Sequence, residues 1–142
     1  MDSEMKRMIM LDNYENPFNK GLTNDDKFDK VNANNESCID NIDLEIKIEN
    51  GIITDMHFDG EACAISTSAT SIMLKLLIGK NIDEALNLIN EYENMIDERE
   101  YNADILQEAI VYSDTYKQPS RKKCALLPYK AIKEYLLSVK NI

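Results

Sequence analysis

The stretch NIDLEIKIENGIITDMHFDG, residues 41–60, decides the fold of this chain. Its first half alternates apolar with charged side chains, a period of two that is typical of a strand with one apolar and one solvated face, and the apolar residues are Ile42, Leu44, Ile46 and Ile48. Asn50-Gly51 indicates a tight turn because both residues tolerate positive φ. In the second half, one face is expected to carry Ile52, Thr54, Met56 and Phe58. The stretch therefore predicts a β-hairpin.

Upstream of the hairpin, residues 4–15 have helical spacing and Pro17 ends the helix. Residues 27–40 read as extended and polar, and they lead into the hairpin. We therefore expect an N-terminal helix followed by a three-stranded antiparallel sheet.

Downstream, the apolar period changes to that of helices. An amphipathic helix is expected over residues 65–77, closed by Gly79, and a second from a capping box at Asn81 to about Met95. Residues 103–114 form a weaker helical stretch. The last helix carries an apolar stripe over residues 125–139. The sequence thus predicts one α+β domain over residues 1–142, with helices covering the sheet.

Cys124 is expected at the N-terminal end of the last helix. Pro128 then has to lie in or near the first turn, where a missing N–H is tolerated.

Charge and hydropathy exclude several functions. The 142 residues carry a formal charge of −10, which disfavours binding to nucleic-acid phosphates. No apolar run is long enough to cross a bilayer, and the N-terminus lacks the apolar core of a secretory signal. We expect a cytoplasmic protein without nucleic-acid or membrane partners.

Three cysteines, Cys38, Cys63 and Cys124, lie far apart in the sequence. An odd number without an export signal argues against a disulfide framework. Cys38 precedes the hairpin, while Cys63 and Cys124 stand where helices are expected to begin. A helix N-terminus stabilises a thiolate, the form that binds metal or attacks sulfur. Inert core cysteines, a redox thiol and a metal site all remain open.

Asp40 is a candidate fourth ligand. In an extended segment its side chain leaves the same face as that of Cys38, two residues earlier. Three thiolates and a carboxylate suit zinc, or iron with sulfide. The spacing alone is a weak signal because it contains no CxxC pair, and Asp40 can equally be a solvated loop acid.

Other catalytic sites find little support in the sequence. His57 is the sole histidine and shares a strand face with Asp55 and Asp59, which favours a surface residue over a ligand. The Ser/Thr run at residues 66–71 has no visible histidine partner for a Ser/His/Asp site. The four glycines are scattered, so no phosphate-binding loop is present.

Four segments in this order resemble the SufU/IscU family of iron–sulfur cluster assembly proteins, also called NifU N-terminal-like. MIMLDNYENPFNKG (8–21) resembles the family's opening helix and turn. NNESCID (34–40), FDGEACAISTSATSIM (58–73) and PSRKKCALLPYKAI (119–132) resemble its three cysteine motifs. The resemblance covers nearly the whole chain and implies the family's fold.

The resemblance implies that the metal or cluster ligands are Cys38, Asp40, Cys63 and Cys124. It also implies that Cys38 accepts persulfide sulfur from a pyridoxal-phosphate cysteine desulfurase of the SufS type.

Three features favour the SufU branch. Lys123 stands where the IscU branch has a histidine, and residues 101–120 look like the SufU insertion. Arg121 matches an arginine of that branch. It is either an auxiliary residue beside the sulfur chemistry or a solvated charge at the helix start.

The first motif departs from the family pattern. Asn35-Glu36-Ser37 replaces a proline-containing approach, and Ile39 replaces a glycine. A β-branched residue resists positive φ, so a turn that needs it would tilt Asp40 away from the metal. Asp40 is still expected to be a ligand.

The leading hypothesis is a zinc-bound sulfur acceptor, sulfurtransferase-like rather than a free-standing enzyme. The alternative is a scaffold on which a transient [2Fe–2S] cluster is built on the same ligands and passed to apo iron–sulfur proteins. A third hypothesis is an interaction domain whose cysteines only pack the core.

Overall fold

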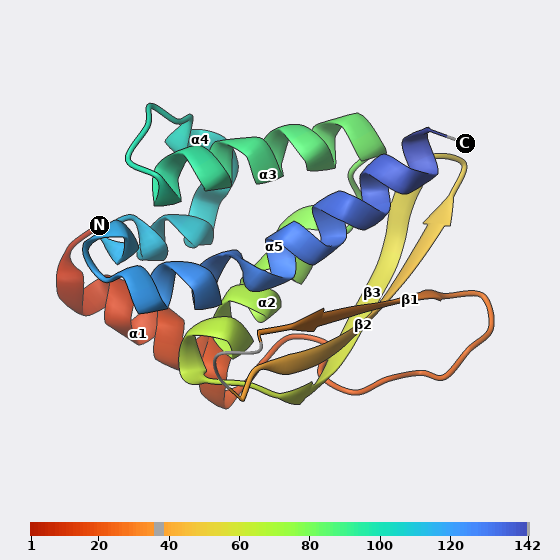
Figure 1. Ribbon diagram of the computed structural model, residues 1–142, viewed down its shortest axis with the longest axis horizontal. Helices are drawn as coiled ribbons and strands as arrows, with labels where there is room; N and C mark the ends of the chain where they lie inside the picture. Colours follow the sequence, from red (N-terminus) through yellow and green to blue (C-terminus); the bar gives the residue numbers. More distant parts are fainter. Residues whose placement is uncertain (36–38, 142) are drawn as a thin grey trace.

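The computed structural model describes residues 1–35 and 39–141. Figure 1 shows the order of the elements along the chain. The strands are β1 (Asp29–Asn34), β2 (Asn41–Glu49) and β3 (Ile52–Glu61). The α-helices are α1 (Ser3–Glu15), α2 (Ala64–Leu77), α3 (Ile82–Ile96), α4 (Ala103–Leu106) and α5 (Pro119–Lys140), with the 3-10 helices η1 (Gln107–Tyr112) and η2 (Thr115–Lys117). The α+β class and the N-terminal helix are confirmed.

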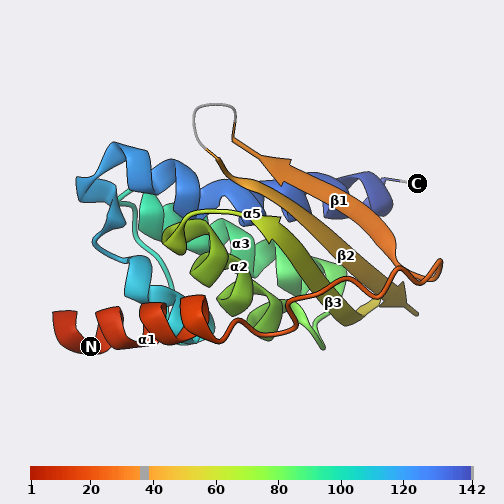
Figure 2. The ribbon, with the colours of Figure 1, turned by 90° about the horizontal axis from the view of Figure 1, so that it is seen from below.

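The sheet has the order β1-β2-β3 and is antiparallel throughout. Asn50 and Gly51 form the hairpin turn with φ of 52° and 77°, as expected of residues that tolerate the left-handed region. Figure 2 shows the three strands on one side of the molecule, with α2, α3 and α5 packed behind them. The predicted three-stranded sheet covered by helices is therefore confirmed.

A β-bulge corrects the predicted face of β3. Lys47 pairs with Asp55, whereas the next residue of β2 already pairs with Ile53. Thr54 is the extra residue on β3, so it faces solvent and its neighbour Ile53 is buried. The prediction that Thr54 shares the apolar face is wrong, because an inserted residue reverses the alternation on one side of it.

The predicted solvated face of β2 is also interrupted. Glu45 is fully buried, and its carboxylate accepts hydrogen bonds from the backbone N–H and hydroxyl of Thr23 at 2.7 and 2.9 Å. A third bond comes from the backbone N–H of Asn24 at 3.0 Å. A buried carboxylate needs such donors to offset its lost hydration. The bonds therefore hold the connection between α1 and β1 against the sheet.

α2 is the central helix of the fold. Every residue from Ser66 to Leu77 except Lys75 is buried. The helix packs against α1, α5, η1 and β3, so the polar face expected of an amphipathic helix is covered as well. The helix was predicted correctly, but its amphipathic exposure was not, because hydroxyl side chains can be buried once they are hydrogen-bonded.

α3 carries the predicted capping box between Asn81 and Glu84. The weak helical stretch at residues 103–114 is divided instead, since Gln107 has a φ of 45° between α4 and η1. Among the helices of residues 1–35 and 39–141, none is long and apolar enough to cross a membrane.

The start of the last helix corrects the sequence prediction. α5 begins at Pro119, so Cys124 lies in the second turn and Pro128 lies inside the helix. Because the N-terminal turn is made by PSRKK rather than by the cysteine, the dipole argument for a Cys124 thiolate does not apply. An interior proline removes one helical hydrogen bond.

Candidate metal centre

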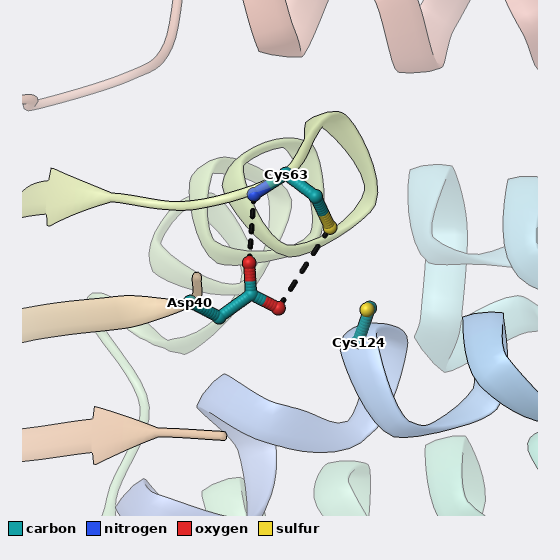
Figure 3. Close-up of side chains that lie close together, drawn as sticks. All are labelled: Asp40, Cys63 and Cys124. Atoms are coloured by element: carbon teal, nitrogen blue, oxygen red, sulfur yellow. Dashed lines mark hydrogen bonds between the residues drawn. The ribbon is translucent and has the colours of Figure 1, made fainter. Parts of the chain in front are cut away.

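Asp40, Cys63 and Cys124 come together from three elements (Figure 3). Asp40 immediately precedes β2, Cys63 lies between β3 and α2, and Cys124 lies on α5. Their ligand atoms, one carboxylate oxygen and two sulfurs, all lie within 4.8 Å of one another. The fold thus gathers three of the four predicted ligand residues at one point.

Cys63 is the N-cap of α2, with an extended backbone at φ −65° and ψ 168°. Its Sγ accepts a hydrogen bond from the backbone N–H of Ser66 at 3.4 Å. This confirms the predicted strand-to-helix position. This sulfur therefore satisfies one of the backbone N–H groups that the first turn of α2 leaves without a helical partner.

Gly60 fixes the approach of the chain to Cys63. Its φ is 128°, and a Cβ at this position would lie 2.2 Å from the backbone oxygen of Asn41. Only glycine allows β3 to run this close to the start of β2. The glycine in the second cysteine motif therefore brings the residues that follow Asp40 close to the residues that precede Cys63.

Asp40 is almost fully buried, with 1% of its surface exposed. Its Oδ1 accepts the backbone N–H of Cys63 at 2.7 Å, and its Oδ2 accepts the hydroxyl of Ser66 at 2.6 Å. Oδ2 also lies 3.8 Å from Cys63 Sγ. Ile39, the residue before Asp40, exposes 72% of its surface. Asp40 thus points into the site although an isoleucine precedes it.

Cys124 is partly buried and faces the other two residues. Burial, together with the nearby Cys63 and Asp40, raises the pKa of the Cys124 thiol to about 12. Without a metal ion, this sulfur is therefore protonated at neutral pH. The sequence-based expectation of a thiolate at a helix start is wrong for this cysteine.

Ser66 is a part of the site that the sequence analysis missed. It is fully buried, and its Oγ lies 3.5 Å from Cys63 Sγ and 3.2 Å from the Cys124 carbonyl oxygen. The signal was present in the spacing Cys63-x-x-Ser66. A residue three positions after a helix N-cap lies over that cap.

The other predicted site residues lie elsewhere. Cys38 falls outside the described residues. Arg121 is exposed in the first turn of α5, where it lines a hollow with Lys117 and Tyr112. His57 pairs with Asp55 at 2.9 Å, as expected of a surface histidine, and is not part of the three-residue group.

The donor set fits a metal ion. Tetrahedral zinc with bonds of about 2.3 Å to sulfur holds two sulfurs about 3.8 Å apart, which matches the close grouping found here. Two cysteines and a carboxylate are ligands that zinc and iron accept. Fold and site together define an α+β protein that gathers cysteines and one aspartate at a place suited to a metal ion.

Comparisons with known proteins agree with this class. The family model for the NifU-like N terminal domain matches residues 5–125. The chain is 36% identical over 129 residues to the zinc-dependent sulfurtransferase SufU of Bacillus subtilis, covering 90% of this chain and 86% of that protein. It is also 36% identical over 105 residues to the iron–sulfur cluster assembly scaffold protein IscU of Thermotoga maritima, covering 74% of each.

A solved structure supports the same relationship. It is an iron–sulfur cluster assembly scaffold protein for the SUF system from Fervidobacterium islandicum AW-1, with a TM-score of 0.80 and 31% identity over 95% of this chain and 99% of that one. The chain belongs to the NifU N-terminal-like family of iron–sulfur cluster assembly proteins.

Proposed function

We propose that this protein is a sulfur acceptor in iron–sulfur cluster assembly, which holds zinc with Asp40, Cys63 and Cys124 and receives sulfur on Cys38. The observation that carries the proposal is the convergence of the first three side chains within 4.8 Å. Cys38 is separated from Asp40 by one residue in the sequence. The relative from Bacillus subtilis, named a zinc-dependent sulfurtransferase, supports this choice.

The proposed reaction is a transfer between sulfurs. The Cys38 thiolate attacks the outer sulfur of a persulfide on a cysteine desulfurase. The sulfur–sulfur bond of the desulfurase breaks, its cysteine leaves as a thiolate with the electron pair, and a new sulfur–sulfur bond forms on Cys38. Zinc at the site would keep the ligand thiols deprotonated and shielded from oxidation.

Arg121 is proposed to serve the encounter with the desulfurase. A cation in the first turn of α5 opposes the helix dipole and so brings no local stability. Lys117 lines the same hollow. Asp114 also lines this hollow and lies 3.7 Å from the Lys117 ammonium. The exposed guanidinium of Arg121 is therefore the group proposed to attract an acidic surface of the desulfurase, which is the role of an auxiliary residue.

The proposed working unit is the whole of residues 1–142, acting in the cytoplasm, where thiols stay reduced. One cluster of buried side chains extends from Ala33 to Leu136. This continuity supports a single domain.

A scaffold function remains a second proposal. The carboxylate of Asp40 among the thiolates favours it, because oxygen is a poorer ligand than sulfur for an iron–sulfur cluster and would ease release to apo iron–sulfur proteins. Zinc, iron and acid-labile sulfide should be measured on protein purified without oxygen or added metal. One zinc and no sulfide supports sulfur transfer, whereas iron and sulfide in matched amounts supports the scaffold.

Cys38→Ala tests the acceptor role directly. The wild-type protein, mixed with a SufS-type desulfurase and cysteine, should gain the mass of one sulfur atom and accelerate sulfide release. The variant should do neither, while zinc still raises its melting temperature. Undiminished acceleration by the variant would reject the role of Cys38. A melting temperature that does not respond to chelator in the wild type would favour a non-metal interaction domain.

A further inference from the structure

We propose that Ser66 is a positioning residue for the metal site, and that Pro128 enables this role by freeing the backbone carbonyl of Cys124. The inference rests on the proposed metal-holding function. It concerns how the chain holds the ligand residues in place rather than which residues they are.

Ser66 contacts all three ligand residues that the structure brings together. Its hydroxyl donates to Asp40 Oδ2 at 2.6 Å and lies 3.2 Å from the Cys124 carbonyl oxygen. Its backbone N–H donates to Cys63 Sγ at 3.4 Å. The side chain has no exposed surface, so water cannot replace these bonds when the hydroxyl is removed.

Pro128 explains why a carbonyl inside α5 is open to Ser66. In an α-helix the carbonyl of residue 124 would accept from the N–H of residue 128, and proline has no N–H. Ser66 supplies a donor to that carbonyl from α2. The next carbonyl, that of Ala125, accepts the hydroxyl of Tyr92 from α3 at 2.9 Å. α5 is therefore held by its neighbours where the proline interrupts it.

The hydroxyl proton of Ser66 has two acceptors. The shorter bond goes to the carboxylate of Asp40, as expected of a charged acceptor. The longer contact goes to the turn of α5 that carries Cys124. One small side chain thus fixes the carboxylate and the backbone of the third ligand residue relative to Cys63.

Ser66→Ala is the first test, with Ser68→Ala as a matched control. Ser68 is a buried serine on the same helix whose hydroxyl lies 2.5 Å from that of Tyr112. We expect Ser66→Ala to weaken zinc binding at least tenfold in competition with a chelator, the size typical of lost partners of metal ligands. Cobalt absorption should also change, since Asp40 loses a fixed orientation. Ser68→Ala should lower the melting temperature but leave zinc affinity within about threefold. Equal zinc losses in both variants, or none in Ser66→Ala, would overturn the proposal.

Pro128→Ala tests the second half. It returns an N–H to the helix, so the Cys124 carbonyl no longer depends on Ser66. In this background Ser66→Ala should cost less zinc affinity and less melting temperature than in the wild type. Identical losses in both backgrounds would reject the link to Pro128.

The melting temperatures of the metal-free variants separate this inference from the proposed function. If the wild type binds no zinc, the proposed function fails. In the metal-free protein, the loss of melting temperature caused by Ser66→Ala can still be compared between the wild-type and Pro128→Ala backgrounds. A smaller loss in the Pro128→Ala background shows that the two residues act together, and equal losses show that they do not. If Ser66→Ala does not fold alone, the double variant is compared with Pro128→Ala. Unchanged zinc affinity and cobalt absorption there would overturn the positioning role.

Discussion

Asp40 accepts a hydrogen bond from the backbone N–H of Cys63 at 2.7 Å, so a side chain just before β2 satisfies the N-cap residue of α2. A free N–H at a buried helix start needs such a partner. The same carboxylate lies beside both sulfurs. Asp40 therefore has a structural role in the metal-free protein in addition to its proposed role as a ligand.

Substitutions of Asp40 should separate these two roles. Asp40→Ala removes the acceptor and should lower the unfolding free energy of the metal-free protein by about 2 kcal/mol. Asp40→Asn keeps an oxygen for the Cys63 N–H and should cost about half as much. Both should weaken zinc binding. Chemical denaturation with and without chelator measures both effects, and equal stability of all three proteins without metal would contradict the capping role.

Zinc affinity should rise with pH because of Cys124. The raised pKa of about 12 means that this thiol is protonated between pH 7 and 9, so zinc has to displace its proton. That proton alone makes the apparent affinity rise about tenfold per pH unit in this range. Calorimetry in buffers of different ionisation enthalpy counts the protons released. Cys124→Ser should release one fewer proton, and an unchanged count would contradict the assignment.

Gly60→Ala should be far more damaging than Gly51→Ala. Both glycines have positive φ, but a Cβ at Gly60 meets the oxygen of Asn41 at 2.2 Å, whereas a Cβ at Gly51 meets nothing within 4 Å. We expect a loss of about 1 kcal/mol at Gly51 and about 3 kcal/mol or more at Gly60. Thermal melting measures both. Zinc affinity should fall only for Gly60→Ala, and equal effects would show that the close approach does not position Cys63.

Glu45→Ala should destabilise the protein by about 3 kcal/mol, because it leaves three donors of Thr23 and Asn24 without their buried acceptor. Asp43→Ala, on an exposed position of the same strand, should stay within about 0.5 kcal/mol of the wild type. Denaturant titration compares the two. A small effect at Glu45 would mean that the segment before β1 holds its place without this carboxylate.

Local patterns in the sequence were sufficient for most elements of the fold. Asn50-Gly51 indicated the hairpin turn, because both residues tolerate positive φ. The Asn81 capping box indicated the start of α3, because its hydrogen bonds join residues only three positions apart. The bulge at Thr54 was not predictable in this way. The bulge depends on which residue of β2 pairs with each residue of β3, and the sequence of one strand does not specify this pairing.

The same distinction between local sequence and tertiary packing applies to the site. The sequence, through its motifs, determined the candidate ligands and the N-cap position of Cys63, which depends only on where a strand ends and a helix begins. Tertiary structure alone decided that Asp40 and Cys63 share a hydrogen bond, that burial raises the pKa of the Cys124 thiol, and that Ser66 reaches α5. Those three properties depend on how close segments far apart in the chain lie to one another and on how deeply they bury each side chain. Neither quantity can be read from the order of residues, because both arise only when the segments pack together.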